Sequence, residues 1–169
     1  MTDDELLLAL LNSTPVEQGL PTDVLADVTT GCAWLADRGG IGSLIELRVT
    51  RTARDLLQAI VRGEAQVADV GLLLRGVRQE PVATADGLTW EVLAPEYRLL
   101  AVRAALAWAA LHETSPGRLR PCANKECRLF LLDRSKANTG RWCSMARCGN
   151  RLKARRHYSR SQELVASDR

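Results

Sequence analysis

The sequence lacks a long apolar run. Its first apolar stretch, LLLALL at positions 6–11, is far shorter than the roughly 20 residues that a membrane-spanning helix needs. Asp3, Asp4 and Glu5 precede this stretch, where a signal peptide would carry positive charge. We therefore expect a cytoplasmic protein without membrane contact, and the reducing cytosol disfavours disulfides.

Aromatic residues are also scarce, at 4% of the 169 residues. In the last third of the chain, Trp142 and Tyr158 are the candidates for stacking on exposed bases, which is how single-stranded RNA is often bound. The sequence further lacks a glycine-rich phosphate loop, a carboxylate pair placed for acid–base chemistry and a Ser/His/Asp set. We therefore expect that the protein is not an enzyme.

Charge is divided unevenly along the chain. Residues 1–117 contain 9 arginines against 16 acidic residues, whereas residues 118–169 contain 14 lysines and arginines against 4 acidic residues. The net charge is therefore −7 in the first part and +10 in the second. This asymmetry predicts that the basic part binds a polyanion; the alternative is that it docks on the protein's own acidic part.

Residues 1–115 have the apolar periodicity of a mostly helical domain. Thr2 and Glu5 fit a capping box, and Ser43 with Glu46 fits a second helix start. The predicted helices cover about 2–11, 22–38, 43–61, 67–77 and 95–112, and the second should bury the stripe Leu25, Val28, Cys32 and Leu35. A length of 169 residues leaves room for a small second module.

Other features of the first part point to packing. Asp86–Gly87 predicts a β-hairpin within residues 81–93, and residues 113–121 are expected to form a linker. His112 should complement the dipole at a helix C-terminus. The side chains expected in the core are Cys32, Trp34, Leu99, Val102, Leu106 and Trp108.

Four of the five cysteines form two pairs with equal spacing. Cys122 and Cys127 are separated by four residues, Cys143 and Cys148 likewise, and fifteen residues lie between the pairs. Four thiolates complete the tetrahedral shell of a structural Zn²⁺, so we expect one structural zinc ion. Two disulfides and redox-active or unliganded thiols are the alternatives.

The residues around the second pair predict a basic helix. The segment 128–143 is expected to form strand, turn and strand, with the reversal at 138–140, and Ser144 is a good N-cap. The helix would extend to about Tyr158, with Cys148 in its first turn. It would carry Arg147, Arg151 and Arg155 on one face, with Lys153, Arg156 and Arg160 on its flanks. The alternative is a merely solvated basic face.

This part of the sequence resembles the CGNR zinc finger family. The tetrad stands at Cys148-Gly149-Asn150-Arg151, within FLLDRSKANTGRWCSMARCGNRLKARRHY. More weakly, LLALLNSTP and CAWLADRG are similar to the ABATE domain that accompanies this finger. Gly140 and the Ser13 insertion in Leu11-Asn12-Ser13-Thr14 depart from the pattern.

The resemblance implies a bacterial protein of a type described as stress-induced transcription regulators. It gives an ABATE-like domain at 1–115, a CGNR-type finger at 118–160 and a disordered tail at 161–169. The expected fold class is mainly α with small β-hairpins, with a helical N-terminal domain and a C-terminal treble-clef or ribbon-like zinc finger.

The last three residues of the tetrad each have two interpretations. Gly149 would let backbone pass close to the metal cluster or a phosphate. Asn150 could bind an adenine edge or order the zinc loop as a buried amide. Arg151 could bind guanine or phosphate, or pair with Asp133.

DNA is the expected partner. The proposed contacts, mostly to phosphates, are Arg147, Asn150, Arg151, Lys153, Arg155, Arg156 and Arg160. Because one small module buries little DNA surface, a homodimer would be needed for useful specificity. The alternatives are an RNA- or ribosome-associated zinc protein and a module that binds an acidic protein.

Overall fold

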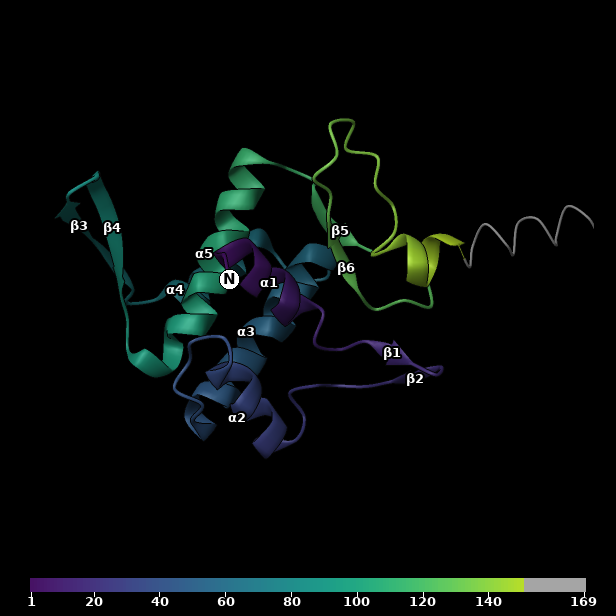
Figure 1. Cartoon of the computed structure of the whole chain (residues 1–169), viewed down its shortest axis with the longest axis horizontal. Helices are drawn as coiled ribbons and strands as arrows, with labels where there is room; N and C mark the ends of the chain where they lie inside the picture. Colours follow the sequence, from purple (N-terminus) through teal and green to yellow (C-terminus); the bar gives the residue numbers. More distant parts are fainter. Residues whose placement is uncertain (151–169) are drawn as a thin grey trace, which may run out of the picture.

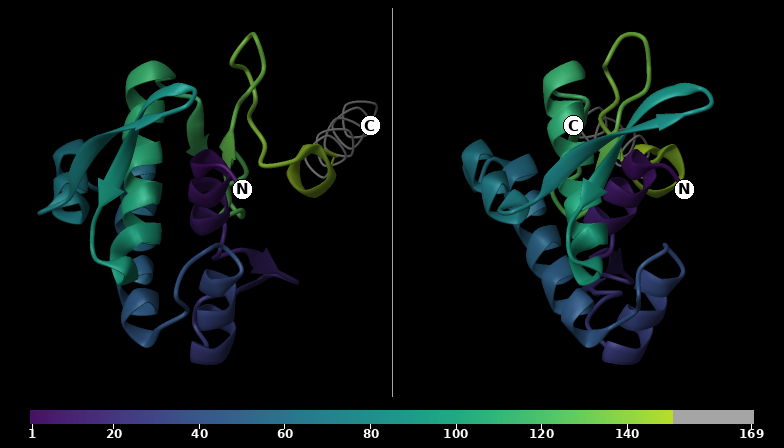
Figure 2. Two further views of the ribbon diagram at one scale, coloured as in Figure 1. Left: turned by 60° about the vertical axis from the view of Figure 1, so that its left-hand side comes forward. Right: turned by 90° about the vertical axis from the view of Figure 1, so that its left-hand side faces the viewer.

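The computed structural model describes residues 1–150. A bundle of helices forms the body, and three separate two-stranded antiparallel sheets lie around it (Figures 1 and 2). The helices are α1 (Asp3–Leu11), α2 (Val28–Ala36), α3 (Leu44–Arg62), α4 (Gly71–Leu74) and α5 (Leu99–Thr114). Short 3₁₀ helices at Val67–Val70 and Glu96–Arg98 precede α4 and α5, and a π-helical turn, η3, covers Met145–Gly149.

The three sheets are hairpins of neighbouring strands. β1 (Val16–Glu17) pairs with β2 (Leu20–Pro21), β3 (Arg78–Thr84) with β4 (Gly87–Leu93), and β5 (Leu119–Pro121) with β6 (Phe130–Leu132). The architecture thus confirms the expectation of helices with small hairpins. Among residues 1–150, no helix is long and apolar enough to cross a membrane.

The predicted starts of α1 and α3 are confirmed. Thr2 accepts a hydrogen bond from the Glu5 amide while the Glu5 carboxylate accepts one from the Thr2 amide, which is a complete capping box. Ser43 accepts from the Glu46 amide at the start of α3. Gly63 ends α3 in the left-handed conformation, with φ +77°, which glycine adopts without steric cost.

The predicted second helix begins later than expected. Asp27 is its N-cap and accepts a hydrogen bond from the Thr30 amide, and the Arg51 guanidinium holds the preceding loop by donating to the carbonyls of Leu25 and Ala26. Leu25, which lies in this loop, is buried, but Val28 is exposed. The stripe prediction is therefore wrong at Val28: the Asp27 cap starts the helix after Leu25, and Val28, as its first residue, lies on an exposed side.

α5 runs through the core and is buried on more than one side. Val102 is fully buried as expected, but Leu99 and Leu106 are only half-buried. The buried positions include the alanines 101, 104, 105 and 107, together with Leu100 and Trp108. A helix that is apolar on almost every face gives no periodic signal. The prediction that Leu99 and Leu106 face the core was wrong for this reason.

Three further expectations are confirmed in outline. Trp108 is buried, and Cys32 and Trp34 are half-buried against the same core. The fourth helix forms only as a 3₁₀ turn followed by α4. The hairpin at 81–93 forms, although its turn is Ala85–Asp86 and Gly87 is already the first residue of β4, opposite Thr84.

The β5–β6 hairpin shares the core of the helices. Phe130 is 1% exposed and belongs to the cluster that contains Leu6, Leu10 and Trp108. The segment expected as a linker is partly ordered, because Leu119–Pro121 forms β5. The prediction of a strand pair within residues 128–143 is wrong: β6 pairs with β5 upstream, and residues 133–143 contain no strand.

Candidate metal centre

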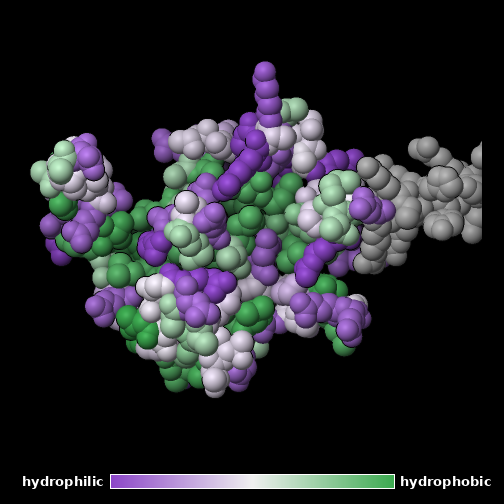
Figure 3. Space-filling model, viewed as in Figure 1, coloured by the Kyte–Doolittle hydropathy of each residue, from purple (hydrophilic) through white to green (hydrophobic). Residues whose placement is uncertain are grey.

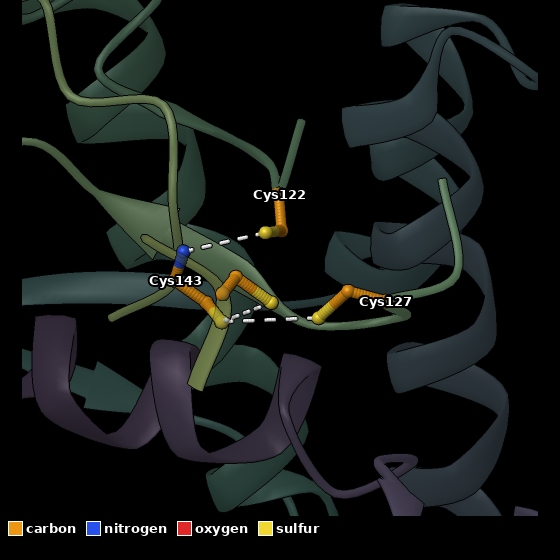
Figure 4. A group of neighbouring side chains, drawn as sticks. Cys122, Cys127 and Cys143 are labelled. Carbon is orange, nitrogen blue, oxygen red and sulfur yellow. Dashed lines mark hydrogen bonds between the residues drawn. The ribbon is translucent and has the colours of Figure 1, made fainter. Parts of the chain in front are cut away.

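The four cysteines Cys122, Cys127, Cys143 and Cys148 come together at one point. All their sulfur atoms lie within 4.8 Å of one another, and the Cys143 sulfur lies 3.8 Å from those of Cys127 and Cys148. A Zn–S bond of about 2.3 Å places tetrahedral sulfurs about 3.8 Å apart. The cluster therefore has the dimensions of a four-thiolate zinc site (Figure 4).

The first pair lies in the turn of the β5–β6 hairpin. The Cys122 amide donates to the Leu129 carbonyl at 2.8 Å, which extends the strand pairing beyond Pro121. The Cys127 amide donates to the Asn124 carbonyl and closes the turn between the two cysteines. Backbone hydrogen bonds thus position both cysteines independently of a metal ion.

The second pair lies at the start of η3. Ser144 is the N-cap and accepts from the Arg147 amide, as predicted, and the Cys148 amide donates to the Ser144 carbonyl. The Cys143 amide points at the Cys122 sulfur, at 3.4 Å, and Figure 4 shows this contact across the cluster. The helical turn thus directs Cys148 at the other three sulfurs.

A loop built on one carboxylate returns the chain from the first pair to the second. Asp133 is buried; it accepts from the amides of Ser135 and Gly140 and pairs with Arg120 at 2.6 Å. Arg118 donates to the carbonyls of Asp133 and Ser135. Arg118, just before β5, and Arg120, within β5, therefore hold the loop of residues 133–143. The Ala123 amide also donates to the Arg141 carbonyl.

Close packing against Asp133 explains why position 140 is a glycine. A Cβ atom at this position would lie 2.9 Å from the Asp133 Cγ atom and 3.0 Å from its Oδ2 atom. The residue that departs from the family pattern thus allows the carboxylate to approach the backbone.

The close surroundings of Gly149 are side chains, and its predicted approach to the metal cluster or a phosphate stays a prediction. A Cβ atom there would lie 2.5 Å from the Met145 sulfur and 3.4 Å from the Trp142 ring, so it would clash with Met145 of the same turn.

Asn124 is a functional residue that the sequence did not reveal. Its buried side-chain amide donates to the Cys148 sulfur at 3.4 Å, and its carbonyl oxygen accepts from the Glu126 amide. Donors to the sulfurs stabilise thiolate charge and orient metal ligands. An asparagine two residues after a ligand is the kind of side chain that forms such a turn, and that spacing is the available signal.

Burial and mutual repulsion keep two of the thiols protonated when no cation is bound. Burial raises the pKa of Cys127 to about 11, and burial together with the charges of Cys122 and Cys127 raises the pKa of Cys143. For Cys148, burial raises the pKa, but hydrogen bonds from Asn124 and the other cysteines outweigh it and lower the pKa. Four thiolates here require a cation, and Zn²⁺ binding would release protons.

The predicted nucleic-acid contacts are only partly described. Arg147, within η3, and Asn150, the residue that caps its C-terminal end, are both exposed. The alternative of a buried amide for Asn150 is therefore wrong. Asp133, which was the alternative partner of Arg151, pairs with Arg120. The remaining predicted contacts lie outside the described residues; they are Arg151, Lys153, Arg155, Arg156 and Arg160. The tail predicted at 161–169 also lies outside them.

Comparison with known proteins agrees with the cysteine geometry. Residues 118–161 match the CGNR zinc finger family. No curated protein matches the chain. The matched segment contains all four clustered cysteines, and their arrangement fits one structural Zn²⁺. None of the five cysteines, all within residues 1–150, forms a disulfide.

Proposed function

We propose that this protein is a DNA-binding regulator of transcription whose four-cysteine zinc module carries the DNA-contacting surface. The observation that carries the proposal is the accumulation of cations around the cysteine cluster. Residues 118–150 contain eight lysines and arginines against two acidic residues. DNA phosphates are bound mainly by such side chains, and that binding is largely independent of sequence.

Burial divides these cations into two groups. Arg118 and Arg120 are half-buried and bonded to the loop at 133–143. The buried Asp133 carboxylate is neutralised by its ion pair with Arg120. The other six are exposed: Lys125, Arg128, Arg134, Lys136, Arg141 and Arg147. Figure 3 shows hydrophilic side chains projecting from this loop.

The sequence that follows η3 adds to this surface. Residues 151–160 contain five lysines and arginines, and we propose Arg151, Lys153, Arg155, Arg156 and Arg160 as phosphate contacts beside Arg147. We propose that Asn150, which is exposed at the end of η3, contacts a base edge, for which an amide side chain is suited. Few aromatic side chains accompany these cations, which favours duplex DNA over single-stranded RNA.

The metal would have a structural role in this proposal. Cys122, Cys127, Cys143 and Cys148 would hold Zn²⁺, which supplies folding free energy and neutralises the thiolates. A shell of four thiolates leaves no position for a substrate. We therefore propose a binding protein rather than an enzyme.

The test compares Cys143→Ser with Cys32→Ser, because Cys32 lies outside the cluster and is half-buried. The purified wild type and Cys32→Ser should contain one zinc per chain, and Cys143→Ser should lose it. Duplexes selected from a random pool should bind the zinc-loaded proteins in fluorescence anisotropy. The logarithm of the affinity should fall with the logarithm of salt concentration, with a slope of about −0.9 per phosphate contacted.

Three results would count against the proposal. Zinc-loaded protein whose duplex affinity does not depend on salt would remove the electrostatic basis. Equal binding by Cys143→Ser would separate the metal from the contact surface. Preference for structured RNA over duplex DNA in direct competition would assign the same cations to a different nucleic acid.

A further inference from the structure

The β3–β4 hairpin stands away from the helical body (Figures 1 and 2). Its two seven-residue strands form a sheet by themselves, and every residue of β3 is exposed, as is all of β4 except Val92. A two-stranded hairpin alone is at best marginally stable in water. A hairpin of this length is therefore expected to gain a packing partner.

One face of this hairpin is apolar. Residues directly opposite each other in an antiparallel pair point to the same side of the sheet, so the register places the pairs Pro81–Trp90 and Ala83–Leu88 on one face. Val92, opposite Gln79, continues that face at the base. We call this surface the hairpin face; it consists of Gln79, Pro81, Ala83, Leu88, Trp90 and Val92.

The hairpin face is exposed where it is most apolar. Leu88 is 64% exposed and Trp90 is 61% exposed. The other three tryptophans of the chain are buried or half-buried. An exposed tryptophan beside leucine and proline is typical of a protein interaction surface.

The charge pattern of the hairpin favours a second copy of this chain as the partner. The hairpin face contains no charged residue, whereas the opposite face carries Arg78, Glu80 and Glu91. A polyanion or a membrane headgroup would need cations that this face lacks. A two-fold axis brings a surface against itself, which requires that the surface not repel its own copy, and an uncharged apolar face meets that requirement.

We propose that the hairpin face is a homodimer interface, in which the β3–β4 hairpins of two copies pack face to face with Trp90 and Leu88 at the centre. Sheets packed in this way lie about 10 Å apart. The inference does not depend on nucleic-acid binding. If both proposals hold, the dimer brings two zinc modules into one particle.

The size of the hairpin face predicts a weak dimer. A tryptophan side chain buries roughly 150–250 Å², and with its small neighbours the face offers roughly half of the 800 Å² per partner that a typical stable interface buries. We therefore expect a dissociation constant on the order of micromolar.

A charge-swap experiment tests the interface with the zinc-loaded full chain and without DNA. In sedimentation velocity from about 1 to 200 μM, the wild type should shift from monomer to dimer. Leu88→Glu and Leu88→Lys should each remain monomeric, because each places like charges across the two-fold axis. An equimolar mixture of the two variants should again form dimers, because the introduced charges are then opposite.

The matched control is Val82→Glu, since Val82 is also exposed in the hairpin but lies on the opposite face; it should dimerise as the wild type does. Zinc content and melting temperature should be equal in all four proteins. A wild type that stays monomeric at 200 μM would overturn the proposal. So would Leu88→Glu dimers as strong as those of the wild type, which would place the interface elsewhere. Neither result would affect the DNA-binding test.

Discussion

Single residues decide how the two cysteine pairs meet. Asp133 accepts three hydrogen bonds or ion pairs from Ser135, Gly140 and Arg120, and Gly140 permits this approach because it lacks a Cβ atom. Asn124 contributes the buried donor to Cys148. None of these three side chains is a metal ligand, yet together they fix where the ligands lie.

Asp133 gives a pH-dependent prediction. Hydrogen bonds from Ser135 and Gly140, and then the Arg120 charge, lower its pKa from 3.8 to about 2. Because the folded pKa lies below the unfolded pKa, the carboxylate stabilises the fold above about pH 4, and this stabilisation disappears as the pH falls towards 2. Asp133→Asn should therefore unfold at lower urea concentration at pH 7, with a difference from wild type that shrinks below pH 4.

Comparison of the two proteins at each pH isolates the carboxylate, because protonation of the cysteines affects both. Asp86→Asn, in the exposed turn of the β3–β4 hairpin, is the matched control and should show no such trend. A wild-type advantage that is constant from pH 7 to pH 3 would contradict an electrostatic role for Asp133.

At the scale of elements, the loop after α1 attaches the zinc hairpin to the helices. The Asn12 side chain pairs with the backbone of Phe130: its Nδ2 atom donates to the Phe130 carbonyl at 3.2 Å, and its Oδ1 atom accepts from the Phe130 amide at 2.7 Å. This side chain thus occupies the outer edge of β6 as a neighbouring strand would. Arg62 of α3 lies 4.7 Å from the centre of the Phe130 ring.

The same loop contributes a second set of polar contacts. Ser13 and Thr14 are buried and accept from Arg54 and Gln58 of α3, while Arg54 forms a bidentate pair with Asp23. Ser13 and Thr14 therefore have a structural role, since they connect the end of α1 with α3.

Asn12→Ala should lower the free energy of unfolding by about 2–3 kcal/mol, because it leaves the amide and carbonyl of Phe130 without their partner in a part-buried position. Urea denaturation of the zinc-loaded protein measures the change. Asn12→Asp retains the acceptor for the Phe130 amide but places a carboxylate oxygen against the Phe130 carbonyl, so it should also destabilise the fold. Asn150→Ala changes an exposed asparagine and should leave stability unchanged; an equal loss there would show that the Asn12 effect is not specific.

At the scale of the whole molecule, the metal centre and the helical core are one packed structure. Phe130, three residues after the ligand Cys127, lies in the core with Leu6 and Trp108. Loss of order at the cysteines would therefore expose part of the same core. This continuity couples metal binding to the stability of the helices.

Removal of zinc should thus destabilise the whole chain. With excess chelator, we expect the melting temperature to fall by on the order of 10 °C or more, since each 1 kcal/mol shifts a protein of this size by about 2–4 °C. Scanning calorimetry should show a single transition that moves. Two transitions, with the helical one at its original temperature, would instead show that the zinc module unfolds independently.

Local patterns determined much of this protein. The spacing of Cys122, Cys127, Cys143 and Cys148 predicted their convergence, because each short local pair already holds two sulfurs near one point. Thr2, Ser43 and Ser144 predicted helix starts because caps are satisfied by residues within one turn. The charge division between the two parts is a matter of composition and needs no fold.

Tertiary structure decided what depends on distant partners. β6 pairs with β5 rather than with a later strand, because Arg118 and Arg120 hold residues 133–143 in a loop around Asp133. The inward face of α5 depends on helices packed on several of its sides, which its own sequence does not encode. The partner of Asn12 lies 118 positions away in the sequence, and only the folded chain brings the two together.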